Sequence, residues 1–234
     1  MSNKQSNNTL LFPITIVIIG IIISAGIFIY RTKYNPDTSN INKNIPQEIG
    51  IKPITSEDKI LGNPNADVIV VVYSDFECPY CKIFHSTMND IMYEYGRDGK
   101  VAWIFRHFPL ESIHKNAKSA AIASECIYRI GGNEKFWAYS NNLFASSTEI
   151  LNKDNLEKIA IDLGVDKEKY NACISSPEIT TKIDADIADG KLIYENDPNF
   201  GTPYSFIITK SGIQTKVIGA QPLLKMKELL GKFI

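Results

Sequence analysis

An uninterrupted apolar run near the N-terminus is the first feature of the chain's hydrophobic pattern. Residues 10–30 read LLFPITIVIIGIIISAGIFIY and contain no charged side chain. At about 1.5 Å per residue, a helix of this length crosses a bilayer core of about 30 Å. We therefore expect a transmembrane anchor, preceded by a short tail over residues 1–9. The alternative is a cleaved signal peptide with its cleavage site at the small residues 24–26, although the apolar run continues past them.

Polar residues replace the apolar ones over residues 31–54, which are rich in Asn, Pro, Ser, Thr and charge. This composition is typical of a flexible linker. Lys4 stands before the apolar run, and Arg31 and Lys33 stand directly after it, so the positive-inside rule gives a nearly balanced orientation. We expect one folded domain to follow the linker, over residues 55–234.

The first part of this domain has the pattern of a β-α-β unit. Ala66–Tyr73 is a continuous β-branched apolar run, which predicts a strand buried on both faces. Apolar residues at helical spacing follow from Pro79, and glycines at 96 and 99 provide a stop. Val101–Phe105 predicts the next strand.

Helical patterns dominate the middle of the domain, and strands return near its end. We expect a helical insertion over about residues 112–196, in which aromatic side chains between 136 and 144 pack between helices. Tyr204–Thr209 and Ile213–Ile218 predict a hairpin, and a helix beginning at Pro222 closes the chain. The fold class is therefore α/β and thioredoxin-like, a central mixed sheet flanked by helices with an inserted all-helical subdomain.

The charge and the cysteine content of the chain limit the classes of function to be considered. Twenty-five basic side chains stand against 26 acidic ones, for a formal net charge of −1, so the chain has no global field that would recruit nucleic acid. We expect no nucleic-acid binding, no cofactor and no metal. The four cysteines comprise one close pair, Cys78 and Cys81, and two that lie far apart in sequence, Cys126 and Cys173. Four cysteines permit three pairings.

The close pair, Cys78-Pro79-Tyr80-Cys81, lies where the first strand gives way to a helix. Unsatisfied N–H groups and the positive end of the helix dipole favour a thiolate at such a position, so we expect Cys78 to be the nucleophile. Pro79 fits the first helical turn because its missing N–H costs nothing there. Cys81 lies one turn deeper and is placed to resolve a mixed disulfide.

A CxxC pair also occurs in zinc sites and as an inert structural bridge. A tetrahedral zinc site needs further ligands, but Cys126 and Cys173 lie far apart on separate predicted helices. His85, His107 and His114 show no ligand-type spacing with them. We therefore favour redox chemistry over the other two interpretations.

Thr202-Pro203 directly precedes a predicted strand. In a redox site of this kind, a cis proline beside the dithiol exposes the preceding backbone so that an extended substrate can pair with it. The alternative is an ordinary trans proline at the first residue of a strand.

Several separated stretches together carry a resemblance to a known family. They are YSDFECPYCKIF at 73–84, FRHFPL at 105–110, AKSAAIASEC at 117–126, KFWAYSNNLF at 135–144 and GTPYSFII at 201–208. In this order they resemble the DsbA-like branch of the thioredoxin superfamily, specifically its membrane-anchored or secreted disulfide oxidoreductases. Glutaredoxins share CPYC but have no helical domain between the dithiol and the proline loop.

The resemblance implies roles for the residues around the dithiol. Cys78 corresponds to the nucleophile, Cys81 to the resolving thiol, and Pro203 to the cis proline, with Thr202 before it. Pro79 and Tyr80 occupy the dipeptide that tunes the reduction potential.

Some relatives carry a second, structural disulfide in the helical insertion, which implies a bridge between Cys126 and Cys173; two buried free cysteines are the alternative. One position departs from the family pattern, because Val72 stands where well-studied members have a buried Glu. We expect Asp75 and Glu77 to lie on the rim of the site.

The implied function is donation of a disulfide to the cysteines of exported proteins. The resemblance further implies reoxidation by a membrane partner of DsbB-like or VKOR-like type, and a monomer anchored by a single span in the cytoplasmic membrane, with its catalytic domain on the extracytoplasmic side. The alternatives are a membrane-tethered reductase or isomerase, and a binding or chaperone module without turnover.

Overall fold

The computed structural model describes residues 51–146, 151–212 and 214–234. The expected anchor over residues 10–30 therefore lies outside the described residues, as does most of the expected linker. Among the helices that are described, none combines the length and the apolarity needed to cross a membrane.

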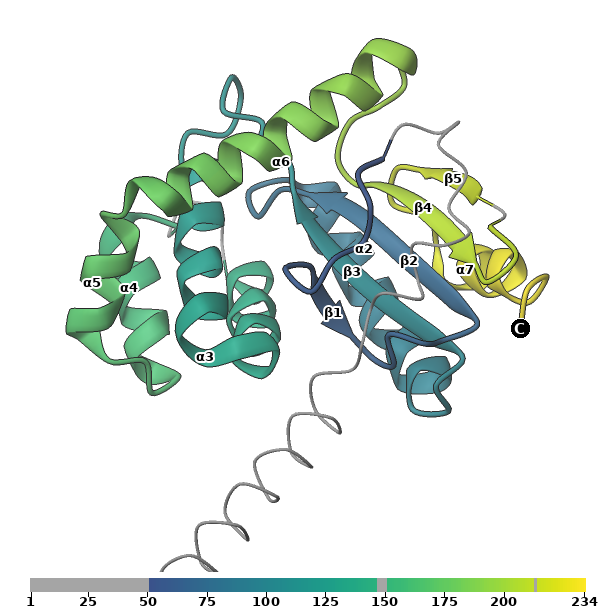
Figure 1. Cartoon of the computed structure of the whole chain (residues 1–234), viewed down its shortest axis with the longest axis horizontal. Helices are drawn as coiled ribbons and strands as arrows, with labels where there is room; N and C mark the ends of the chain where they lie inside the picture. The colour runs from purple at the N-terminus through teal and green to yellow at the C-terminus, as the bar shows by residue number, and fades with distance from the viewer. Residues whose placement is uncertain (1–50, 147–150, 213) are drawn as a thin grey trace, which may run out of the picture. The chain divides into compact units, whose positions relative to one another are not determined.

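A five-stranded mixed sheet forms the centre of the described domain (Figure 1). Its spatial order is β1-β3-β2-β4-β5; β2 and β3 run parallel, and every other neighbouring pair is antiparallel. The strands are β1 Lys59–Leu61, β2 Val68–Ser74, β3 Val101–His107, β4 Tyr204–Thr209 and β5 Gln214–Ile218. The predicted strands are confirmed to within two residues, whereas β1 was not predicted because it is only three residues long.

Helices follow and interrupt these strands in the predicted order. They are α2 Pro79–Ile91, α3 Ala117–Ala145, α4 Lys153–Asp162, α5 Lys167–Ile174, α6 Pro177–Asn196 and α7 Leu223–Leu230. A π-helical turn, Met92–Gly96, extends α2. Gly132 divides α3 with a φ of 73°, a conformation that glycine adopts without a steric penalty. The helices α3 to α6 make up the predicted insertion.

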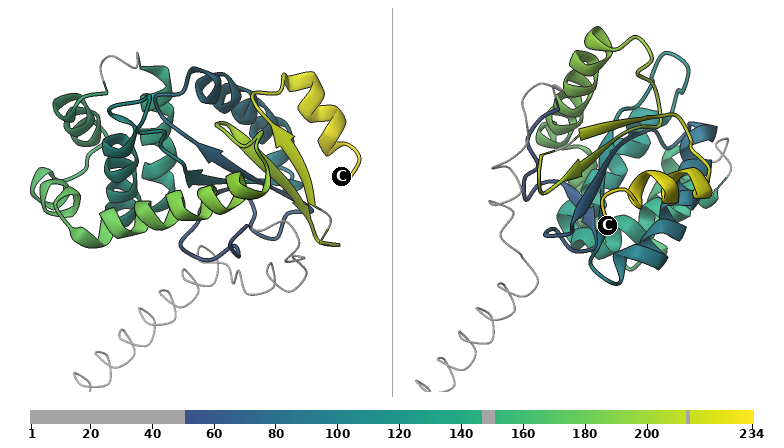
Figure 2. Two further views of the ribbon diagram at one scale, coloured as in Figure 1. Left: turned by 90° about the horizontal axis from the view of Figure 1, so that it is seen from above. Right: turned by 90° about the vertical axis from the view of Figure 1, so that its right-hand side faces the viewer.

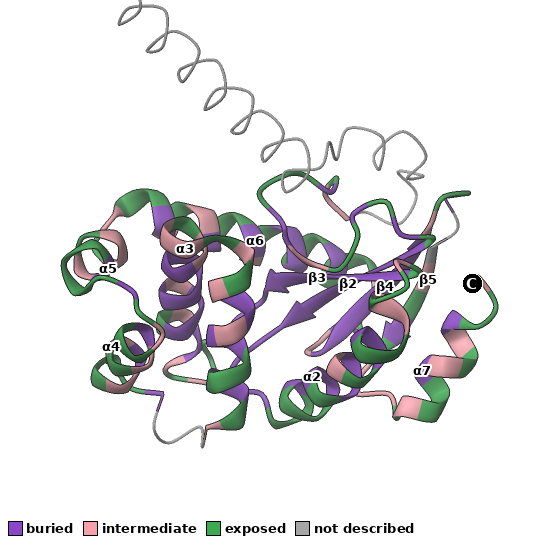
Figure 3. Ribbon diagram, turned by 90° about the horizontal axis from the view of Figure 1, so that it is seen from below, coloured by how far each residue is buried: buried purple, intermediate pink, exposed green. Residues whose placement is uncertain are grey.

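The sheet has two buried faces, and different helices cover them (Figure 2). Val70, Val72 and Phe105 point to face one, where they pack with side chains of α2, α3 and α7. Ile69 and Val71 point to face two, where they pack with Ile193 of α6 and with residues that precede β1. Figure 3 shows the resulting layers, with buried strands between helices whose outer surfaces are exposed.

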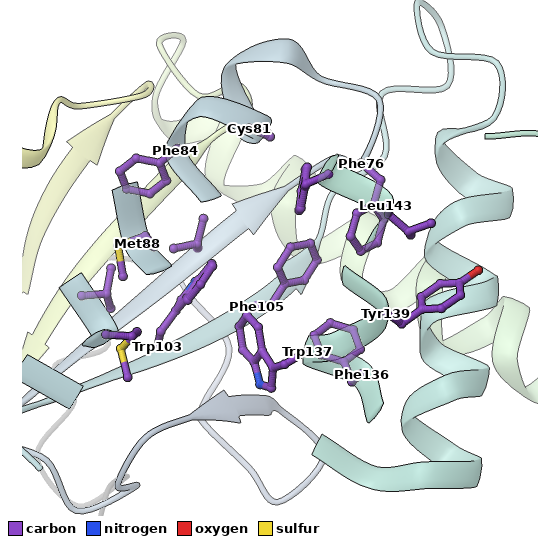
Figure 4. Packing of buried hydrophobic residues seen from close by; sticks show 14 of the residues in the cluster. Phe76, Cys81, Phe84, Met88, Trp103, Phe105, Phe136, Trp137, Tyr139 and Leu143 are labelled. Atoms are coloured by element: carbon purple, nitrogen blue, oxygen red, sulfur yellow. The ribbon is translucent and has the colours of Figure 1, made fainter. Parts of the chain in front are cut away.

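Aromatic side chains fill face one between α2, β3 and α3 (Figure 4). Phe76 stacks on Phe105 with ring centroids 5.1 Å apart, and Phe105 meets the edge of Phe136 at 5.6 Å. Trp137 lies 5.3 Å from Phe136. The aromatic residues of α3 are core residues, as predicted, but they pack on β3 as well as between helices, and so attach the helical insertion to the sheet beside α2.

A segment that we name the N-terminal strap, residues 51–58, is fixed to face two by buried charges. The Arg106 guanidinium donates to the carbonyls of Lys52 and Pro53 at 2.9 and 3.1 Å and pairs with Asp58 at 2.9 Å. The Lys52 N–H donates to Asp189 of α6 at 3.1 Å. The strap therefore belongs to the packed domain, and packing begins before residue 55.

Asp58→Ala is expected to destabilise the domain, because Arg106 is only 1% exposed and would lose the carboxylate that accepts two of its hydrogen bonds, keeping, among its carboxylate contacts, only the longer one with Asp189 at 3.7 Å. Removing one member of a buried pair typically costs about 3 to 5 kcal/mol in the free energy of unfolding. Asp67→Ala is the matched control, since Asp67 pairs with Lys210 at the surface and should cost less than about 1 kcal/mol. Equal midpoints of urea unfolding for the two variants would contradict this assignment.

A disulfide joins Cys126 of α3 to Cys173 of α5 across 47 residues. Closing a loop of this length restricts the unfolded chain by about 4 kcal/mol in the chain-entropy model. The double variant C126A/C173A should therefore unfold at a lower urea concentration than the wild type. Alkylation of Cys78 should keep its wild-type rate in this variant, because the bridge lies in the helical insertion; unchanged unfolding would sink the prediction.

Candidate active site

The dithiol lies at the start of α2, directly after the carboxyl end of β2. Cys78 is the N-cap residue, with extended backbone angles (φ −72°, ψ 120°), and Pro79 occupies the first helical position. The Cys78 N–H donates to the carbonyl of Asp75 at 3.2 Å, which turns the chain from the strand into the helix. The sequence starts the helix here because proline is preorganised for its first turn.

Cys78 carries a free thiol whose surroundings favour the thiolate. A hydrogen bond from the Cys81 thiol is the largest influence, and the backbone N–H groups of Cys81 and Tyr80 add to it. Burial opposes these effects, yet together they lower the pKa of Cys78 to about 6. This sulfur is therefore largely ionised at neutral pH, which is the state that a nucleophilic cysteine requires.

Cys81 meets the opposite environment. It is only 1% exposed, and burial raises its pKa well above the ordinary value, an effect that the neighbouring Cys78 reinforces. Two polar groups oppose the rise: the side chain of Ser74 and the N–H of Asp75, which lies 3.5 Å from the Cys81 sulfur. The inner thiol is thus held neutral while the outer one ionises.

The bond between Thr202 and Pro203 is cis, and the Thr202 carbonyl lies beside the dithiol. The Cys78 thiol is 3.3 Å from the Thr202 carbonyl oxygen, although 124 positions separate the residues in sequence. Antiparallel pairing of β4 with β2, which sets Tyr204 opposite Tyr73, brings this loop to the start of α2.

The other predicted residues divide between this site and the insertion. Pro79 and Tyr80 lie on the open side of the dithiol, where Tyr80 is 65% exposed. Cys126 and Cys173 lie in the helical insertion and are bonded to each other, so they offer no thiolates to a metal at the dithiol. In the described part of the chain, no three His, Cys, Asp or Glu side chains are grouped as metal ligands.

The expectation that Asp75 and Glu77 lie on the rim is wrong. Asp75 is 1% exposed and Glu77 is 7% exposed. Both carboxylates turn inward because they accept N–H donors from the segment between β3 and α3: Leu110 donates to Asp75 at 2.8 Å, and Asn116 donates to Glu77 at 2.6 Å. The sequence shows these acids beside the dithiol but not the distant donors.

Titration of the reduced full chain should show Cys78 losing its proton near pH 6, followed by the ultraviolet absorbance of the thiolate. Because the folded pKa lies below the unfolded one, the unfolded chain binds more protons between about pH 6 and pH 8. The free energy of unfolding of the reduced protein should therefore rise with pH across that window. In Cys78→Ser the rise should be smaller, because only buried His85 and His107, whose pKa values burial lowers, would still contribute to it. A Cys78 midpoint near that of a free cysteine in the wild type would contradict the assignment.

Comparison with known proteins places this geometry in a family. The family model described as thioredoxin matches residues 55–213, most of the chain. A solved structure of alpha-DsbA1 from Wolbachia pipientis is 26% identical, with a TM-score of 0.63 over 77% of this chain and 92% of that one.

Two curated relatives are similar to much of this chain. A protein of Rickettsia prowazekii, named provisionally as a protein-disulfide oxidoreductase, is 29% identical over 182 residues, which are 73% of this chain and 60% of that protein. An Na⁺/H⁺ antiporter, NhaA 1, of Mycolicibacterium gilvum is 30% identical over 168 residues. The match takes up 69% of this chain but only 26% of the antiporter, so the chain spans about a quarter of that relative. The chain belongs to the thioredoxin family, and its architecture is that of the DsbA-like thiol-disulfide oxidoreductases.

Proposed function

We propose that the protein donates its Cys78–Cys81 disulfide to the cysteines of exported proteins. The observation that carries the proposal is the Cys78 sulfur at the N-cap of α2, 3.3 Å from the Thr202 carbonyl and with a pKa lowered to about 6. A low pKa stabilises the reduced form that remains after the disulfide has been given away, and this favours oxidation of the substrate.

The exchange takes two steps. A substrate thiolate attacks the Cys78 sulfur, the Cys78–Cys81 bond breaks, and Cys81 leaves as a thiolate that takes up a proton. A second substrate thiolate then attacks the substrate sulfur of the mixed disulfide, and Cys78 leaves as a thiolate. The substrate loses two electrons and gains a disulfide, while the enzyme is left as a dithiol.

Thr202 and Pro203 suit the binding of an extended substrate. The Thr202 carbonyl faces the attacked sulfur and is available to pair with a peptide N–H once Cys78 has become part of the mixed disulfide. Exposed Tyr80 and Ile83 on α2 offer apolar contact beside it. An unfolded polypeptide presents both an extended backbone and apolar side chains.

The proposed setting is the extracytoplasmic side of a membrane. Residues 10–30 would supply the anchor, and the Cys126–Cys173 bridge fits an oxidising compartment. The two electrons gained in each cycle would pass to a membrane partner of DsbB-like or VKOR-like type that restores the disulfide.

The purified full chain tests the proposal in two assays, oxidative refolding of a reduced protein substrate and reduction of insulin. The oxidised wild type should speed refolding, and Cys78→Ser should abolish the effect. Cys81→Ser should instead accumulate mixed disulfides, because the resolving thiol is missing. Equal performance of wild type and Cys78→Ser would overturn the proposal in favour of a binding module.

A titration of the dithiol in glutathione buffers gives the direction of electron flow. A reduction potential well above that of thioredoxin, about −270 mV, is expected for a disulfide donor. A potential at or below that value would contradict donation and assign the protein to the reductases.

A further inference from the structure

Asp75 is a buried carboxylate beside the dithiol that the proposed exchange does not use. Its side chain has no exposed surface. One carboxylate oxygen accepts the N–H of Glu77 at 2.8 Å, and the other accepts the N–H of Leu110 at 2.8 Å and lies 2.8 Å from His114 Nδ1. Three donors thus converge on one carboxylate.

The backbone of the same residue contacts both cysteines. The Asp75 carbonyl accepts the Cys78 N–H at 3.2 Å, and the Asp75 N–H donates to the Cys81 sulfur at 3.5 Å. The position of Asp75 therefore fixes the direction of a hydrogen-bond donor aimed at the inner sulfur.

We propose that Asp75 is a positioning residue for Cys81: its carboxylate, held by His114 and Leu110, orients the backbone N–H that stabilises the Cys81 thiolate during exchange. The inference rests on the proposed function and names the part of the protein that makes its inner sulfur reactive. It also explains how the Cys81 thiolate is stabilised although Val72, on β2, provides no carboxyl group beside it.

The need for such a donor follows from the burial of Cys81. A thiolate that is 1% exposed receives little help from water, and the apolar neighbours of Cys81 offer none. The Ser74 side chain and the Asp75 N–H are the groups that act against this burial. If the Asp75 N–H pointed away from the sulfur, the Cys81 thiolate would be harder to form. This would slow both the step in which Cys81 leaves and the step in which it attacks.

The geometry favours positioning over direct proton transfer by Asp75. Both carboxylate oxygens are occupied by donors from Glu77, Leu110 and His114, and it is the backbone N–H that faces the sulfur. Glu77 provides an internal comparison. Its carboxylate ties the same two segments together by accepting the N–H and the side-chain amide of Asn116 at 2.6 and 3.0 Å, yet neither bond reaches a cysteine.

The test follows single-turnover exchange between the reduced full chain and oxidised glutathione. Cys78 attacks the glutathione disulfide, and one glutathione leaves. The Cys81 thiolate then attacks the Cys78 sulfur, the Cys78–glutathione bond breaks, and the second glutathione leaves as a thiolate that takes up a proton. At high concentrations of oxidised glutathione this intramolecular step limits the rate, so its pH profile reports the ionisation of Cys81.

Asp75→Asn and His114→Phe should shift this pH profile upward. Release of the second glutathione should slow by about threefold to tenfold at neutral pH, the worth of one hydrogen bond, and should recover at higher pH. Glu77→Gln, the matched control, should follow the wild-type profile. If Asp75→Asn does not fold, as judged by thermal unfolding of its oxidised form, His114→Phe carries the test with Asp75 in place.

Slowing that is the same at every pH would mark a merely structural role and overturn the inference, as would an equal shift in Glu77→Gln. If the wild type itself releases no glutathione, the proposed function fails and the inference fails with it. If the wild type reacts and both Asp75→Asn and His114→Phe follow its profile, only the inference is lost.

Discussion

Two sulfurs one helical turn apart meet opposite electrostatic surroundings, and the chemistry of the domain depends on this difference. Cys78 caps α2 and receives hydrogen bonds from the Cys81 thiol and from N–H groups of the first turn, whereas Cys81 lies deeper, where burial disfavours charge. The same helix start therefore produces one thiolate and one thiol. A pair with equal surroundings would have no preferred site of attack.

The rest of the fold brings distant segments to this helix start. Parallel pairing of β2 with β3 aligns Ser74 with His107, so the chain leaving β3 passes beside the dithiol and supplies the donors to Asp75 and Glu77. Antiparallel pairing of β2 with β4 delivers Thr202 to the other side of Cys78. The pairing of the strands thus brings together two segments that are far apart in sequence, the one that follows β3 and the one that precedes β4. The helical insertion lies between these two segments in the sequence.

Hydrophobic periodicity and motif spacing were enough to predict the main strands, the helix starts and the position of the dithiol. The β-branched runs located β2 and β4, proline marked the starts of α2 and α7, and CPYC was correctly placed at the passage from strand to helix. These features are local, so a linear pattern can express them.

Features that depend on contacts distant in sequence could not be predicted. Asp75 was expected on the rim, because its donors Leu110 and His114 lie 35 and 39 positions away. β1 was not predicted because it is short and begins with a buried lysine, Lys59, whose partner Glu125 lies in α3. In both cases a charged residue is buried because a partner from another element meets it.

The N-terminal strap and the dithiol lie on different faces of the sheet. Ile51 and Ile54 pack on face two, whereas Cys78 and Cys81 belong to the cluster on face one. The strap thus packs on the face of the sheet opposite to the one with which Cys78 packs. Under the proposed function, a substrate that binds beside Cys78 would therefore leave the face on which the strap packs uncovered.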